Sequence, residues 1–271
     1  METNGLSYGV ISTLPGSRAL KSGDLEAFSK ILGNSWGDKY GGLPDVLDER
    51  FHSGELFFDA YHQERPIGLL ETISLSLEEP PKNIPSKLLE EISRNLGKSI
   101  GQLTQKEIDA AYICSQLQDY SNVTNFGKWR PPAKNPNVLL FVDLTVPEEH
   151  RGGRYFPPLS TGLVNLPKFL LSRDQDAEKQ LGYLPKEKVQ ELKSLKENVP
   201  QLKFWKWAVT YTPDHDPIRN FHLRQYAFDT GKVLKNARPG FAPNGKTQFS
   251  DVRPTCYMAP EFAAQSGYMF K

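Results

Sequence analysis

Apolar positions along the chain follow two periods, and the shorter one predicts the strands. The segment Asn137 to Val146 is almost continuously apolar, which is typical of a central strand covered on both faces of a sheet. Residues 55–61 and 66–76 are β-rich runs joined by a short polar stretch, so they predict a hairpin. Further strands are expected over 202–212 and near Lys232 and Tyr257.

The helical period predicts the remaining elements. Asp24 follows Ser22 and Gly23 as a start signal, and Leu25 and Phe28 then fall on one helical face. Further helices are expected over 88–96, from Thr104, over 159–170, over 185–198, and around Phe221 and His222. The resulting order alternates single helices and strands around a hairpin, so the chain predicts a mixed α/β (α+β) domain with a central mixed sheet flanked by helices.

The domain organisation is expected to be simple. Residues 1–271 form one domain, interrupted by a helical insertion over 79–136 and by a second, shorter insertion over 173–201. Pro80, Pro81 and Pro85 open the first insertion, and a Pro/Asn/Lys-rich connector closes it. The first insertion is expected to form one wall of an acceptor site or a surface for a partner.

Composition and charge narrow the function classes. The chain has 33 basic and 32 acidic residues, so no bulk field recruits nucleic acid or an anionic membrane. Its longest apolar run is half the length that a membrane span needs, and its first residues lack the pattern of a secretory signal. A cytoplasmic location is therefore expected, with Cys114 and Cys256 as reduced, buried thiols.

Several enzyme classes leave no signature in the sequence. It contains no Gly-x-Ser-x-Gly elbow, no His-Glu-x-x-His helix and no Walker loop. The remaining histidines, at positions 52, 62, 150 and 215, show no spacing typical of metal ligands. A metal site is not expected.

The buried strand is followed by a sharp turn into a helix. The first turn of a helix presents backbone N–H groups without intrahelical partners, and the helix dipole adds positive potential there. A pyrophosphate suits such a position. The segment Val138 to Leu159 therefore predicts an anion site beside the strand.

Three phrases in the same order resemble the GNAT acyltransferase superfamily. They are "GELFFDAYHQERPIGLLETI", "VLLFVDLTVPEEHRGGRYFPPL" and "FWKWAVTYTPDHDPIRNFHLRQYAF". The resemblance implies a GNAT-type mixed sheet, a coenzyme A thioester as co-substrate, and no tightly bound cofactor. It implies that the thioester binds at the strand-to-helix turn, through Leu144, Val146, Arg151, Gly152, Gly153 and Arg154.

The turn departs from the family pattern. Arg154 and Phe156 stand where the family has small residues, and Pro157 and Pro158 lack N–H groups. Arg151 and Arg154 are then expected to supply contacts that backbone amides give in the family. The alternative is that the turn keeps the fold and has lost the cofactor.

His222 lies where the family has a tyrosine near the thioester sulfur. A histidine there can act as an acid or a base near neutral pH, whereas the alternative is a buried histidine with only a structural role. The phrase Phe221 to Ala227 also resembles the GNAT-like loading domains of polyketide assembly lines, which decarboxylate malonyl thioesters or pass acyl groups to a carrier-protein thiol. That resemblance implies catalytic roles for Trp36 and Thr145 and a carboxylate-binding role for Arg238.

Transfer to an amine needs a base that removes a proton from the attacking nitrogen. Glu71 on the hairpin and Asp143 on the central strand are the candidates, and strict alternation puts Asp143 and Thr145 on one face. Tyr211, on the following strand, is expected to face the substrate.

Three hypotheses follow. The first is an acyltransferase that moves an acyl group from a coenzyme A thioester to an amine or thiol. The second is a GNAT-like decarboxylase or S-acyltransferase that acts on malonyl thioesters with an acyl carrier protein. The third is a non-catalytic protein of the same fold that binds an acyl chain or a partner.

Overall fold

The computed structural model describes residues 5–14, 17–36, 44–52, 55–118, 136–151, 155, 157–172, 175–199, 204–213, 216–224, 227–231, 240–241, 248–249 and 252–258. The strands are β1 (Leu6–Ile11), β2 (Phe57–His62), β3 (Arg65–Leu75), β4 (Val138–Thr145), β5 (Trp207–Pro213), β6 (Phe228–Asp229), β7 (Gly240–Phe241), β8 (Gln248–Phe249) and β9 (Val252–Met258). The helices are α1 (Asp24–Trp36), α2 (Pro44–His52), α3 (Ser86–Leu96), α4 (Gln105–Ser115), α5 (Leu159–Leu171), α6 (Lys186–Asn198) and α7 (Asp216–Arg224).

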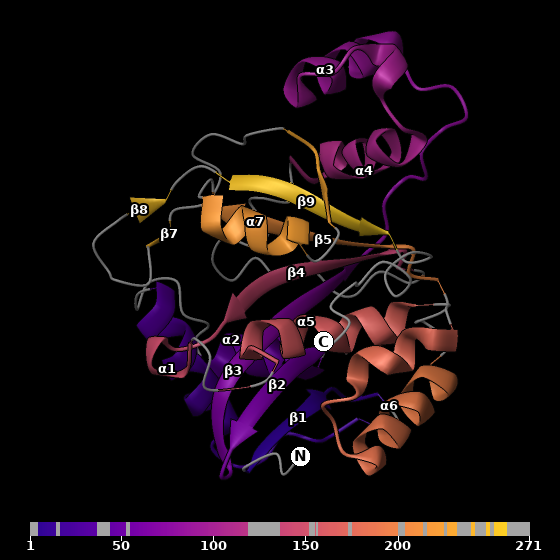
Figure 1. Cartoon of the computed structure of the whole chain (residues 1–271). Coiled ribbons are helices and arrows are strands. Elements are labelled where there is room, and N and C mark those ends of the chain that lie inside the picture. Colours follow the sequence, from indigo (N-terminus) through magenta and orange to yellow (C-terminus); the bar gives the residue numbers. More distant parts are fainter. Residues whose placement is uncertain are drawn as a thin grey trace.

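Seven strands form one mixed sheet in the order β1-β2-β3-β4-β5-β9-β6 (Figure 1). β1 to β4 pair antiparallel, β4 and β5 pair parallel, and β9 pairs antiparallel with both β5 and β6. β7 and β8 form a separate two-stranded ribbon. The mixed α/β fold class predicted from the sequence is confirmed.

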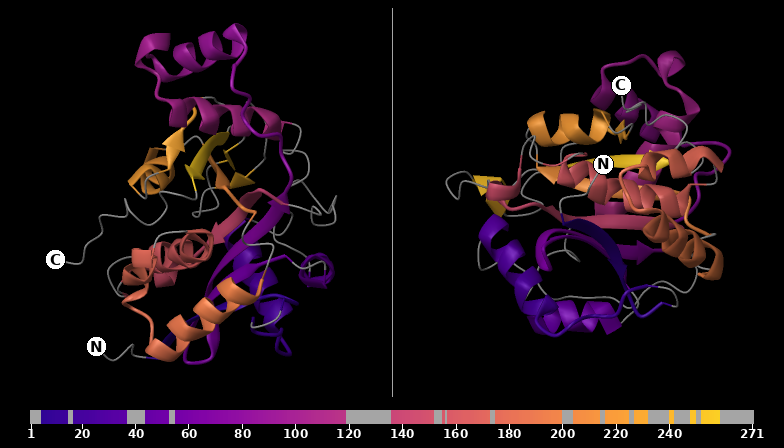
Figure 2. Two further views of the ribbon diagram at one scale, coloured as in Figure 1. Left: turned by 90° about the vertical axis from the view of Figure 1, so that its right-hand side faces the viewer. Right: turned by 60° about the horizontal axis from the view of Figure 1, so that its bottom comes forward.

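Helices cover both faces of this sheet. α5, α6 and α7 lie on one face, here named the α5 face, while α1 and α2 lie on the opposite face, named the α1 face (Figures 1 and 2). On the α5 face, Leu139 and Phe141 of β4 share a core with Leu163 and Leu166 of α5. On the α1 face, the core of α1 and α2 includes Leu69 of β3.

The insertion contributes α4 to the α1 face. Ile113 of α4 shares a core with Leu140 of β4 and Val209 of β5, so the helix covers the middle of the sheet. The last turn of α3 lies directly on the chain after β6, because a Cβ at Gly231 would stand 2.3 Å from the carbonyl oxygen of Asn95. Gly231 also has a φ of +66°, which favours glycine.

Cys114 and Cys256 meet in this region. Cys114 lies on α4 and Cys256 on β9, and both are buried free cysteines. Burial, together with a hydrogen bond between the two side chains, raises the pKa of the Cys256 thiol. The Cys256 thiol is therefore held protonated and unreactive in the packed core.

The sequence pattern did not predict β1, α2 or the short strands β7 and β8. β1 is Leu-Ser-Tyr-Gly-Val-Ile, in which a glycine interrupts a run of only six residues. A tertiary contact explains why position 9 is a glycine, since a Cβ there would lie 2.6 Å from an oxygen of Asp59 on β2. Among the described helices, none has the length and apolar character that crossing a membrane requires.

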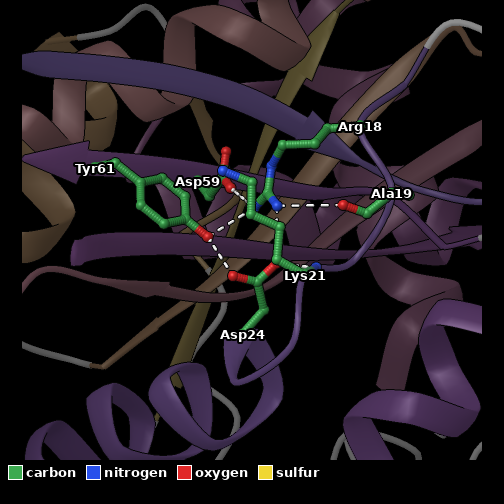
Figure 3. A network of polar contacts seen from close by, with 6 residues as sticks. All are labelled: Arg18, Ala19, Lys21, Asp24, Asp59 and Tyr61. Carbon is green, nitrogen blue, oxygen red and sulfur yellow. Dashed lines mark hydrogen bonds and ion pairs between the residues drawn. The ribbon is translucent and has the colours of Figure 1, made fainter. Parts of the chain in front are cut away.

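A buried ion-pair network fixes the start of α1 to the sheet (Figure 3). The Arg18 guanidinium contacts Asp59 at 2.5 Å and Asp24 at 2.8 Å, and it donates to the Tyr61 hydroxyl at 2.7 Å. Tyr61 in turn donates to Asp24 at 2.8 Å. One cation thus forms ion pairs with two carboxylates, one at the start of α1 and one on β2.

The pKa values of the two carboxyl groups in this network shift in opposite directions. Burial raises the pKa of Asp59, and the Arg18 charge only partly opposes it. Burial also acts on Asp24, but the Lys21 N–H and Arg18 outweigh it and lower the pKa of that carboxyl. Arg18 therefore stabilises the folded state most when Asp59 is ionised.

We expect Arg18→Met to lower the free energy of unfolding by about 3–5 kcal/mol at pH 7, because it leaves a buried carboxylate without its cation. Since the folded-state pKa of Asp59 is raised, protonation at lower pH removes that carboxylate charge, and the loss should shrink as the pH is lowered toward 4. Urea unfolding from pH 4 to pH 7 measures both effects. Arg94→Met, on the exposed side of α3, is the control, and a loss that does not change with pH would contradict the role given to Asp59.

Candidate active site

The sheet divides where β4 meets β5. Their parallel ladder runs from Val138 opposite Trp207 to Phe141 opposite Thr210 and ends there. β4 continues to Thr145 and β5 to Pro213, while β9 stays paired with β5 over its whole length. β4 and β5 therefore form a fork that opens toward their carboxyl ends, the edge where ligands bind in many open sheets.

A β-bulge in β4 sets the faces of the side chains beyond the fork. Glu71 of β3 is opposite Asp143, but the next residue, Thr72, is opposite Phe141, so Val142 is the extra residue. The side-chain alternation shifts by one position at this point. As a result Leu144 packs with the core of the α5 face.

The bulge gathers three predicted residues on the α1 face. Asp143 and Thr145 share one face, as alternation predicts, and the register puts them with Glu71 and Leu69 of β3. Glu71 is 0% exposed, Thr145 2% and Asp143 6%. Two carboxyl groups and a hydroxyl thus lie together in the interior beside the fork.

His222 lies on the opposite face, in α7. It is 3% exposed, and its neighbour Phe221 packs against the core of the α5 face. Burial, with the charge of Lys168 adding to it, lowers the pKa of His222 to about 3. At neutral pH the imidazole is therefore uncharged, which favours a hydrogen-bonding role over storage of a proton there.

Lys168 of α5 is the residue that the sequence analysis missed. It is 1% exposed, and burial lowers the pKa of its amine to about 7. The signal was present in the sequence, because Lys168 is the only charged residue in the apolar run from Leu159 to Leu171. An isolated lysine in such a run is a candidate for a buried amine.

The start of α5 lies beside the end of β4. Pro158 is the residue before the helix and Leu159 the first helical one, so the prolines precede the first turn and remove none of its N–H donors. No described side chain caps that turn. The Arg151 side chain donates from Nε to the carbonyl of Val146 at 2.7 Å, which fixes a guanidinium near the end of β4.

Two tyrosines hold the first turn of α5 against its surroundings. Tyr183 donates a hydrogen bond of 2.8 Å to the carbonyl of Gly162. The hydroxyl of Tyr8 lies so close that a Cβ at Gly162 would stand 2.4 Å from it. Gly162 is therefore required by packing, and the direction of the helix start is well determined.

The remaining predicted residues are only partly described. Trp36 ends α1 and Tyr211 lies in β5, but their side chains fall outside the described residues. Gly152, Gly153, Arg154 and Arg238 also lie outside them. In the described part of the chain, no group of three His, Cys, Asp or Glu side chains is arranged to hold a metal ion.

No protein-family model and no curated protein matches this sequence. Solved structures with a similar arrangement include the loading GNATL domain of CurA from Lyngbya majuscula, at 12% identity and TM-score 0.42, covering 93% of this chain and 98% of that one. The GphF GNAT-like decarboxylase in complex with isobutyryl-CoA is 11% identical, with TM-score 0.42 and coverage of 89% and 98%. A GNAT family acetyltransferase from Elizabethkingia anophelis with acetyl-CoA bound is 10% identical, with TM-score 0.36 and coverage of 94% and 99%.

We expect the lowered pKa of His222 to appear in the stability of the protein. Between pH 6.5 and 3 the unfolded chain binds a proton that the folded state does not, so stability falls as the pH falls through this range. Between pH 6.5 and 4.5, His222 should lower the free energy of unfolding by about 2–3 kcal/mol, and His222→Gln should abolish this decrease. Urea unfolding at several pH values measures it, and His52→Gln on exposed α2 should keep the wild-type slope. A His222→Gln slope equal to that of the wild type would contradict the burial of a neutral imidazole.

Proposed function

We propose that this protein is an acyltransferase that moves an acyl group from a coenzyme A thioester to an amine. The observation that carries the proposal is the fork between β4 and β5, which has different chemistry on its two faces. His222 and Lys168 lie on the α5 face, and Glu71, Asp143 and Thr145 lie on the α1 face. Two reactants that approach from opposite faces can meet where the strands diverge.

The α5 face fits the thioester. The first turn of α5 offers backbone N–H groups to a pyrophosphate, and Arg151 adds a cation beside it. When bound, coenzyme A supplies the activated acyl group. The neutral imidazole of His222 can then donate a hydrogen bond to the sulfur or the carbonyl oxygen of that thioester.

The α1 face fits an amine. Glu71 and Asp143 are directly opposite each other on neighbouring strands, so their carboxyl groups lie within reach of one substrate group. A carboxylate attracts a cationic amine and can accept the proton that the nitrogen must lose before it attacks. Thr145, two residue pairs further along the ladder, can hold the carbonyl oxygen.

The first test uses acetyl-CoA and malonyl-CoA with tyramine, spermidine and pantetheine as acceptors, followed by mass spectrometry. We expect an acetylated amine, and at about 100 times Kd the bound thioester should stabilise the protein by about 2.7 kcal/mol. Arg151→Ala should weaken thioester binding, whereas Arg94→Ala on α3 should not. Loss of carbon dioxide from malonyl-CoA without amine acylation would replace the proposal with a decarboxylase. If neither thioester raises the melting temperature, the proposal fails in favour of a non-catalytic role.

The second test concerns the acceptor. Glu71→Gln and Asp143→Asn each keep size and polarity but remove a charge. We expect kcat/KM for spermidine to fall by about 10²-fold, because the substrate ammonium loses the base that converts it to the attacking amine. The Kd for acetyl-CoA should not change, because the thioester approaches the other face. Glu178→Gln, at an exposed ion pair with Lys193, is the matched control. A loss of acetyl-CoA binding in Glu71→Gln or Asp143→Asn would contradict the division of the two faces.

A further inference from the structure

The second insertion, residues 173–201, packs along α5. Its described parts include a short 3-10 helix, Gln175–Leu181, and α6, which lies beside α5 in both views (Figures 1 and 2). Leu181 and Leu195 of this segment share a core with Leu166 of α5. The insertion therefore packs against the helix whose first turn belongs to the proposed thioester site.

Polar contacts join the insertion to both ends of α5. At the first turn, the Tyr183 hydroxyl donates to the carbonyl of Gly162 at 2.8 Å. At the last turn, the Lys196 ammonium donates to the carbonyl of Phe169 at 3.0 Å and lies 4.8 Å from the centre of the Phe169 ring. Carbonyl groups in the last turn of a helix have no partner within the helix, so Lys196 satisfies one of them. The insertion thus holds α5 at two separate places.

α5 contains a residue that weakens its own hydrogen-bond ladder. Pro167 lies inside the helix, and a proline has no N–H to donate to the carbonyl of Leu163, four residues earlier. The proline ring also crowds that carbonyl, so helices bend readily at such a position. The direction of the turns before Pro167 therefore depends on contacts from outside the helix, and Tyr183 supplies one of them.

Tyr8 of β1 acts on the same turn through packing. A Cβ at Gly162 would stand 2.4 Å from the Tyr8 hydroxyl and 2.6 Å from Cζ of its ring, so Tyr8 fills the space that a side chain would need. In the described part of the chain, the Tyr8 hydroxyl has no hydrogen-bond partner. The rings of Tyr8 and Tyr183 meet edge to face, with their centroids 5.2 Å apart. Tyr8 thus supplies a surface against which the turn packs, and Tyr183 supplies a directional contact.

We propose that Tyr183 is a positioning residue for the thioester, through which the second insertion orders the first turn of α5. This role rests on the proposed acyl transfer, in which N–H groups of that turn bind the pyrophosphate of coenzyme A. A ligand binds more tightly where the donors already point toward it, because less order has to be gained on binding. Tyr183 acts on the ligand through the backbone of Gly162, which it holds in place.

The test compares the wild type with Tyr183→Phe, which removes the hydroxyl and keeps the ring. We expect the Kd for acetyl-CoA, measured by calorimetry, to rise about fivefold, because one hydrogen bond of this kind contributes about that factor to an equilibrium. The KM for acetyl-CoA should rise with it. The kcat and the KM for spermidine should not change, because the acceptor binds on the α1 face.

Tyr61→Phe is the matched control. The Tyr61 hydroxyl also donates at 2.8 Å, but to Asp24 on the α1 face. Each variant loses one tyrosine hydroxyl, so both should have a lower melting temperature, and only Tyr183→Phe should have a higher Kd for acetyl-CoA. An equal rise of Kd in both variants would indicate a general loosening of the fold and would overturn the role of Tyr183.

Hydrogen exchange of backbone amides gives a readout independent of activity. The amides of residues 162–166 close the first turns of α5, and they should exchange faster in Tyr183→Phe than in the wild type. The amides of α4, which has no contact with Tyr183 in the proposed role, should keep their rates. Saturating acetyl-CoA should slow the exchange of residues 162–166 in both proteins, because the bound ligand orders the turn.

The outcomes separate this role from the proposed function. If Tyr183→Phe binds acetyl-CoA with the wild-type Kd, the positioning role is overturned, while the acyltransferase stands. If the wild type binds neither acetyl-CoA nor malonyl-CoA, the proposed function fails first. Hydrogen exchange then still decides whether Tyr183 orders the turn, since unchanged rates for residues 162–166 in Tyr183→Phe overturn it.

Discussion

A parallel ladder of four residue pairs joins the two halves of the sheet. β1 to β4 form one half and β5, β9 and β6 the other, and among the described strands only the pairs from Val138–Trp207 to Phe141–Thr210 connect them. So short a ladder fixes the direction of the two halves but lets them diverge beyond it. The fork is the result, and each candidate reactive group takes its position from it.

Helices compensate for the missing strand pairs. α4 packs on Ile73 and Leu140 of the first half and on Val209 and Cys256 of the second, so it bridges the sheet on the α1 face. α5 and its core do the same on the α5 face, where Phe141 and Ala208 belong to one cluster. The insertion that looked like an addition in the sequence thus packs over both halves of the sheet at the base of the fork.

Most elements could be predicted from sequence because their patterns are local. The apolar run of β4, the hairpin of β2 and β3 and the capping box at Thr104 all appear where the sequence indicates, and the Thr104 hydroxyl accepts from the N–H of Glu107 as that motif requires. The sequence did not predict β1, because the glycine that interrupts this strand is explained only by its contact with Asp59 on another strand. The same limit applied to the site, since the bulge at Val142 depends on pairing with β3, and the low pKa of His222 depends on its burial and on Lys168 of α5.

The buried charges separate structural from chemical roles. Asp59 is held by Arg18, with Tyr61 and Asp24 completing a network at the start of α1, which is the pattern of a group kept for specificity of packing. Lys168 and His222 are a different case, because burial lowers the pKa of both groups and so favours their neutral forms, and the Lys168 charge adds to this effect on His222. The carboxyl groups of Glu71 and Asp143 lie on the other face of the sheet, where they suit a cationic amine.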